Sequence, residues 1–269
     1  MKFGTSAWSI PEKDIYKKMD IAKAVGYDGI ELTLDADGPT GMDATPEDWA
    51  KIRKYADDLG LELPSVATAL HWQSPITSND EEVREKAIAI VEKELEMAAA
   101  LGADSILVVP GMVSGGKNGI RYDDAYDRAL SAIKRLAPKA EELKVKIGLE
   151  NVWNNFLLSP IEMRDFIDKV GSPYVGAYLD VGNLIAYAFP EQWVRILGKR
   201  IVKVHFKDFR KAGSAWVDIM AGDVDWPEVM TALGEVGYDD WVTAEMGSYK
   251  HFPEAMLTAS LNAMKIICK

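Results

Sequence analysis

The stretch IVKVHFK (residues 201–207) alternates apolar and polar side chains and contains one of only three histidines in the chain. This alternation predicts a β-strand, in which successive side chains point to opposite faces. The apolar side chains then share one face, and the other face carries Lys203, His205 and Lys207. A lone histidine in a strand is typical of a core residue, so the role of His205 depends on what the neighbouring strands carry.

Seven further stretches have strand character, and longer amphipathic segments alternate with them along the chain. The strand candidates are residues 2–8, 29–34, 63–69, 105–111, 146–152, 176–182 and 241–246. Residues 80–102 and 122–143 repeat apolar side chains at helical spacing. Several expected helices end in a glycine suited to a left-handed cap. Eight such β-α units without a linker predict a parallel sheet. We expect one domain over residues 1–269, a (β/α)8 TIM barrel with its active site at the C-terminal ends of the strands.

Four consecutive strand candidates each place one possible metal ligand on the face opposite their apolar row. All four ligands lie near the C-terminal end of their strand. Three of them are carboxylates, which would repel one another and resist burial without a counter-charge. A divalent cation resolves this conflict, and a histidine supplies the nitrogen ligand that Mn²⁺, Co²⁺ or Zn²⁺ accepts. The alternative is a salt-bridge cluster in which Lys146, Lys203 and Lys207 neutralise the acids. The four side chains are Glu150, Asp180, His205 and Glu245.

The motifs GLEN (148–151), LDVGN (179–183), VHFKD (204–208) and TAEM (243–246) resemble those of the xylose-isomerase-like TIM-barrel superfamily of sugar and sugar-phosphate isomerases and epimerases. The resemblance spans nearly the full length, and the pattern is most similar to ketose 3-epimerases, including those acting on pentulose 5-phosphates. It implies that Glu150, Asp180, His205 and Glu245 hold one divalent metal ion, most often Mn²⁺, with Co²⁺, Mg²⁺ or Zn²⁺ as alternatives. It also implies that Glu150 and Glu245 form an acid/base pair that moves a proton through a metal-bound enediolate.

The same resemblance suggests substrate contacts. Asn183 stands where many free-ketose epimerases of the superfamily have a histidine, which favours the phosphopentulose enzymes, although a turn residue is an equal alternative. Lys207, and either Arg210 or Lys211, are candidates for binding sugar hydroxyls. Glu31 points inward by strand parity, and we expect it to make a structural hydrogen bond rather than act in catalysis. The remaining candidates, each with an ordinary loop or core position as the alternative, are His71, Trp8, Trp153 and Asn154.

Composition excludes several classes of partner. A formal charge of −11 argues against a surface that tracks a phosphate backbone, so we expect no nucleic-acid partner. The single cysteine, Cys268, permits no intramolecular disulfide. Residues 1–14 lack the apolar core of a signal peptide, and no stretch reaches the roughly 18 apolar residues of a membrane helix. We expect a cytoplasmic protein without a membrane partner, and the resemblance implies a homo-oligomer, a dimer or a tetramer.

Several functions remain open at this point. The same four ligands support a metal-dependent dehydratase of the inosose or dehydroshikimate type, which would eliminate water from the enediolate. A non-catalytic sugar-binding barrel is a more remote alternative. The apurinic endonuclease branch of the superfamily needs more histidines than the three present. The motifs do not decide which sugar is bound or whether it is phosphorylated. Residues 208–225 form a longer connection than a routine βα loop and are candidates to cover a site.

Overall fold

Eight parallel strands close into a barrel in the computed structural model, which describes residues 1–269. Around the barrel the order is β1-β10-β7-β6-β5-β4-β3-β2, so neighbours in the chain are neighbours in space. All strands run in one direction, and their C-terminal ends therefore meet at one rim. The predicted (β/α)8 barrel is confirmed. Its strands are β1 (Lys2–Ser6), β2 (Gly29–Thr33), β3 (Ser65–Ala67), β4 (Ser105–Val108), β5 (Lys146–Glu150), β6 (Val175–Asp180), β7 (Ile201–Phe206) and β10 (Trp241–Ala244).

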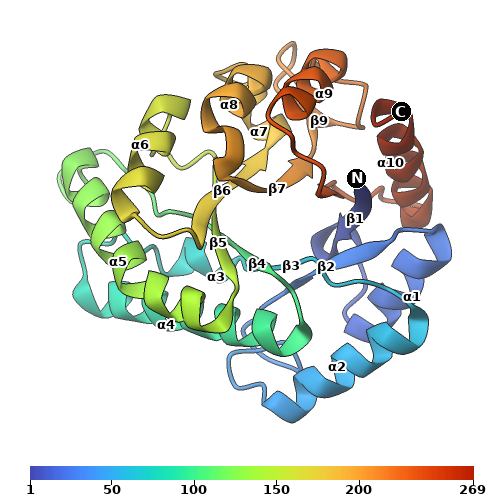
Figure 1. Cartoon of the computed structure of the whole chain (residues 1–269), viewed down its shortest axis with the longest axis horizontal. Coiled ribbons are helices and arrows are strands. Elements are labelled where there is room, and N and C mark those ends of the chain that lie inside the picture. The colour runs from blue at the N-terminus through green and yellow to red at the C-terminus, as the bar shows by residue number, and fades with distance from the viewer.

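Helices form a ring outside the strands, and α10 returns beside α1 and β1 to complete it (Figure 1). None of these helices combines the length and the apolar composition needed to cross a membrane. The α-helices are α1 (Ile15–Val25), α2 (Pro46–Leu59), α3 (Leu70–Gln73), α4 (Glu81–Leu101), α5 (Tyr122–Leu143), α6 (Pro160–Val170), α7 (Val181–Ile185), α8 (Pro190–Leu197), α9 (Trp226–Glu235) and α10 (Pro253–Ile267). Two short 3-10 turns are η1 (Ala7–Ser9) and η2 (Gly198–Arg200).

Strand parity and helix caps account for how the layers fit together. Val204 and Phe206 of β7 are fully buried in the apolar layer beneath the helices, as the alternation in residues 201–207 predicts. The predicted glycine caps are present, because Gly26, Gly60 and Gly102 take left-handed conformations at the ends of α1, α2 and α4. This packing leaves the opposite face of each strand pointing into the barrel.

The connection after β7 is more ordered than the loop expected over residues 208–225. It contains a two-stranded antiparallel hairpin of β8 (Asp208–Arg210) and β9 (Ala215–Val217), with Phe209 paired to Trp216. Gly213 takes a positive φ of 86° in the turn, a conformation that favours glycine. The hairpin begins one residue after the end of β7 and so lies at the rim where the strands end.

Candidate metal and active site

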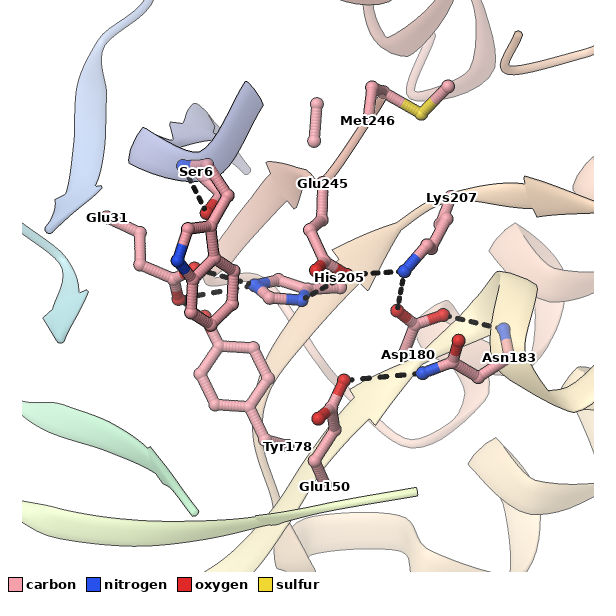
Figure 2. A network of polar contacts seen from close by, with 12 residues as sticks. Ser6, Glu31, Glu150, Tyr178, Asp180, Asn183, His205, Lys207, Glu245 and Met246 are labelled. Carbon is pink, nitrogen blue, oxygen red and sulfur yellow. Dashed lines mark hydrogen bonds and ion pairs between the residues drawn. The ribbon is translucent and has the colours of Figure 1, made fainter. Parts of the chain in front are cut away.

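Four strands bring one oxygen or nitrogen donor each to a common point at the C-terminal rim. Glu150 and Asp180 end β5 and β6, His205 lies in β7, and Glu245 follows β10. One donor atom from each residue lies within 4.8 Å of all the others. Figure 2 shows the three carboxylates and the imidazole directed toward one another. The register supports this arrangement, because His205 is the direct neighbour of Asp180 in β6 and of Thr243 in β10.

The donor set fits a divalent metal ion. Asp180 and His205 are fully buried, yet Asp180 Oδ2 and His205 Nδ1 have no hydrogen-bond partner. Leaving such polar atoms buried and unpaired is costly, and binding a cation satisfies both. Three carboxylates and one imidazole are the oxygen and nitrogen donors that Mn²⁺, Co²⁺ and Zn²⁺ share. These four residues would therefore hold the ion.

Two asparagines hold the carboxylate ligands in place. The backbone N–H of Asn183 donates to Asp180 Oδ1 at 2.7 Å, because Asp180 caps the N-terminus of α7. The Asn183 side chain donates to Glu150 Oε1 at 3.3 Å. Asn151 bridges from β5 to β6 by donating to the Asp180 carbonyl at 2.8 Å and accepting from its N–H at 3.0 Å. Both amides therefore orient ligands.

Glu31 fixes the imidazole from the side opposite the ligand cluster. Its Oε1 and Oε2 lie 3.1 and 3.2 Å from His205 Nε2 (Figure 2). The Glu31 carboxylate also accepts from Tyr178 Oη at 2.5 Å and from Ser65 Oγ at 2.8 Å. The expected structural hydrogen bond of Glu31 is therefore made to His205.

Only one of the three lysines expected in a salt-bridge cluster reaches the acids. Lys207 Nζ is 2.8 Å from Glu245 Oε2 and 3.9 Å from Asp180 Oδ2. Lys146 is exposed at the other end of β5. Lys203 also points inward, but its Nζ pairs with two aspartates at the N-terminal end of the barrel, Asp104 at 2.8 Å and Asp240 at 2.6 Å. One ammonium faces three carboxylates, so lysines alone do not balance the site.

The two glutamates have opposite pKa shifts. Burial, followed by the charges of Glu245 and Asp180, raises the pKa of Glu150 well above its ordinary value. Burial opposes ionisation of Glu245 too, but the contacts of its carboxylate with His205, at 3.6 Å, and with the positive charge of Lys207 outweigh burial and lower the pKa to about 2. Such a separation of two carboxyl groups suits them to opposite acid and base roles.

The remaining substrate-contact candidates differ in how far their polar side-chain atoms are already hydrogen-bonded within the protein. His71 is buried, with Nδ1 accepting from Val109 N–H at 3.3 Å and Nε2 facing Glu94 at 3.6 Å. Asn154 is buried and donates to the Gly111 carbonyl, and the exposed Arg210 side chain donates to the Ala221 carbonyl. Apart from His71 Nε2, which has no hydrogen-bond partner, these polar groups bind the protein itself. Trp8 lies in η1 directly after β1 and is about one-third exposed. The substrate contacts of all four stay predictions.

Two residues beside the site escaped the sequence interpretation. Trp216 in β9 stacks on Trp153 with ring centroids 4.9 Å apart, and Lys207 Nζ lies 4.5 Å from the Trp216 ring. No periodic signal marks Trp216, because its place depends on the hairpin. Asn151 lies within the GLEN motif, but strand parity directs attention only to its neighbour Glu150. Trp153 in turn donates from Nε1 to the Asn183 carbonyl at 2.8 Å.

Fold and donors together define a class, an α/β barrel with a candidate metal centre at the C-terminal rim of its strands. The family model described as "Xylose isomerase-like TIM barrel" matches residues 19–267. The chain therefore belongs to the xylose isomerase-like TIM barrel family. The resemblance inferred from the four motifs is confirmed.

Several proteins similar to this chain are sugar epimerases, which are isomerase-class enzymes. The L-ribulose-5-phosphate 3-epimerase UlaE of Shigella flexneri serotype 5b (strain 8401) is 24% identical over 242 residues, which cover 86% of this chain and 82% of the relative. The crystal structure of a D-psicose 3-epimerase in the presence of D-fructose has a TM-score of 0.81 at 20% identity, covering 99% of this chain and 98% of that one. The IOLI protein with a binding zinc atom has a TM-score of 0.80 at 20% identity and covers 100% and 98%. These structures share the fold of this chain.

Proposed function

We propose that this protein is a divalent-metal-dependent 3-epimerase of a ketose or a ketose phosphate. The observation that carries the proposal is the convergence of Glu150 and Glu245 on Asp180 and His205, with donor atoms within 4.8 Å of one another. Glu150 ends β5 and Glu245 directly follows β10, and these two strands flank the strands that carry Asp180 and His205. The names of the relatives, L-ribulose-5-phosphate 3-epimerase and D-psicose 3-epimerase, support the same reaction.

The chemistry follows from these positions. A divalent ion in the site, which we expect to be Mn²⁺, supplies Lewis-acid polarisation of the substrate oxygens and so acidifies the C–H bond between them. One glutamate, as carboxylate, removes the C3 proton, and the other, as carboxylic acid, returns a proton to the opposite face of the planar enediolate. The configuration at C3 is thereby inverted. General acid–base catalysis of this kind contributes about 10² to 10⁴-fold to the rate.

Neighbouring side chains keep the two glutamates available for this exchange. Asn183 donates to Glu150 Oε1, and Lys207 donates to Glu245 Oε2. Each contact restrains one carboxyl group without blocking its second oxygen. We infer that these residues orient the pair, and that Trp153 and Trp8 contribute apolar surface for the substrate carbons.

A substrate panel tests the proposal. Manganese-loaded protein is incubated with free ketoses, their 5-phosphates and inososes, and NMR identifies the products. We expect C3 epimers of a ketose or of a ketose 5-phosphate, and comparing the two sets of rates decides whether a phosphate is recognised. An unsaturated product would move the assignment to a dehydratase. Formation of an aldose would indicate an isomerase instead, and no conversion by metal-loaded protein would favour a binding barrel.

A further inference from the structure

Lys207 is the single residue between strand β7 and the hairpin of β8 and β9. Its ammonium is 2.8 Å from Glu245 Oε2 and 3.9 Å from Asp180 Oδ2, so it touches one candidate ligand and faces a second (Figure 2). The side chain is 19% exposed, which leaves it a path toward solvent. A lysine in such a position either stays among the carboxylates or turns outward.

Trp216 keeps the ammonium among the carboxylates. The ring centroid lies 4.5 Å from Lys207 Nζ, within the range of a cation–π contact. Trp153 stacks on Trp216 at 4.9 Å, and Phe209 packs against its edge at 5.0 Å. The Trp216 ring is therefore fixed by its aromatic neighbours, and Lys207 loses both an aromatic and a carboxylate partner if it turns outward.

Asp208 anchors the segment that carries Trp216. Its buried carboxylate accepts hydrogen bonds from four backbone N–H groups and from one indole N–H at 2.9 to 3.3 Å. Gly222 is needed for this wrapping, because a Cβ there would lie 2.1 Å from Asp208 Oδ1. The donors are Phe209 N, Met220 N, Gly222 N, Val224 N and Trp226 Nε1.

The charges at the site then match a divalent ion. As metal ligands, Glu150, Asp180 and Glu245 are carboxylates with three negative charges and His205 is a neutral imidazole. Lys207 contributes one positive charge. The balance is two net negative charges, which one divalent cation neutralises. Without Lys207 the donor set would carry three net negative charges. That charge suits a trivalent cation better than a divalent one, and it also attracts a divalent cation more strongly.

We propose that Lys207 is a built-in counter-charge that adjusts the donor set to a divalent ion and limits its affinity. The proposal rests on the proposed function, since it takes the four donors to hold a metal. In this role Lys207 contributes to ion selection whether or not it also touches the substrate, and Trp216 is the residue that positions it.

Ion affinities test the proposal without any assay of activity. Mn²⁺ and Tb³⁺ are titrated by calorimetry into metal-free wild-type protein and into Lys207→Met. We expect the variant to bind Mn²⁺ at least tenfold more tightly and Tb³⁺ more tightly by a still larger factor. Lys199→Met is the matched control, because it removes an exposed, unpaired lysine just before the other end of β7. Its affinities should stay within twofold of wild type.

Lys207→Arg keeps the charge and guards against a methionine variant that fails to fold. Its ratio of Tb³⁺ to Mn²⁺ affinity should stay within threefold of wild type. If wild type binds one Mn²⁺ and Lys207→Met binds Mn²⁺ and Tb³⁺ with the same affinities as wild type, the role of Lys207 is overturned and the proposed function is not. A tenfold rise in the ratio of Tb³⁺ to Mn²⁺ affinity in Lys207→Arg would have the same consequence. Failure of the wild-type protein to bind either ion would instead overturn the proposed function.

Discussion

His205 Nε2 lies 3.1 Å from Glu31 Oε1, and both side chains are completely buried. A carboxylate can only accept at this contact, so Nε2 carries a hydrogen and Nδ1 is the ring nitrogen that faces the ligand cluster, 3.6 Å from Glu245 Oε2. Tyr178 and Ser65 donate to the same carboxylate and hold it in place. The imidazole is thereby oriented as a ligand before any ion arrives.

Glu31→Gln should therefore weaken binding of a divalent ion about 10- to 100-fold, because partners that orient a metal-binding histidine typically contribute that much. Calorimetric titration of Mn²⁺ measures the change. Ser65→Ala removes one donor to Glu31 but leaves the contact with His205, so its effect should be smaller. Equal affinities in wild type and Glu31→Gln would show that this contact does not orient the ligand.

Glu150→Gln and Glu245→Gln should each reduce turnover at least about 100-fold, since each variant removes one of two groups that exchange the proton. Rates are compared for the substrate found with wild type, at saturating metal, and circular dichroism checks the fold. Glu142 lies outside the ligand cluster, near the end of α5, and Glu142→Gln on the exposed surface serves as the matched control. A glutamine variant that keeps near-wild-type turnover removes that residue from the acid/base pair.

The stability of the protein should depend on the protonation of His71. Burial lowers the pKa of His71 to about 4, against about 6.5 in an unfolded chain. Above pH 6.5 neither state binds the proton, but between about pH 6.5 and 4 the unfolded state binds it and the folded state does not. The free energy of unfolding should therefore fall by about 1.4 kcal/mol for each unit that the pH falls in this range.

Urea unfolding of wild type and His71→Gln at pH 7, 6 and 5 measures that loss. The facing carboxyl of Glu94 has a pKa raised well above its ordinary value by burial, so it offers little negative charge to a protonated His71. The difference in unfolding free energy between the two proteins should shift against wild type as the pH falls. A difference that stays constant from pH 7 to 5 would contradict the buried, neutral state of His71.

At the N-terminal end of the barrel, removing the two aspartates that pair with Lys203 should destabilise the protein more than removing Lys203 itself. Lys203 is 2% exposed in its side chain, whereas Asp104 and Asp240 are 60% and 44% exposed. Replacing both aspartates by asparagine leaves a buried, unpaired ammonium and should cost about 3 to 5 kcal/mol. Lys203→Met leaves two hydrated carboxylates and should cost less. Urea unfolding that gives the opposite order would contradict this account.

Strand parity predicts much of the candidate site, because a side chain in a strand has only two directions. It places Glu150, Asp180, His205 and Glu245 on the inner face, and the structure brings their donor atoms together. Parity does not say which end of the barrel a side chain serves. Lys203 and Lys207 share one face of residues 201–207, yet the first pairs with aspartates at one end and the second with a ligand at the other.

Features that depend on tertiary contacts were outside the reach of the sequence. The hairpin that carries Trp216 is held by the Asp208 carboxylate, whose partners lie up to 18 residues further along the chain. The buried position of His71 depends on Glu94 and on the backbone of Val109, which belong to other elements of the fold. No local pattern records such contacts, so Trp216 escaped prediction and His71 was predicted only as a candidate.

Exchange with solvent deuterium tests the central claim most directly. Metal-loaded protein converts its ketose or ketose phosphate in D₂O, and NMR follows the label at early times. With two glutamates acting on opposite faces, we expect one deuterium at C3 of the product epimer, none at C1, and recovered substrate that is still unlabelled. Product that lacks deuterium at C3, or label that appears equally early in the recovered substrate, would contradict proton exchange by the pair Glu150 and Glu245.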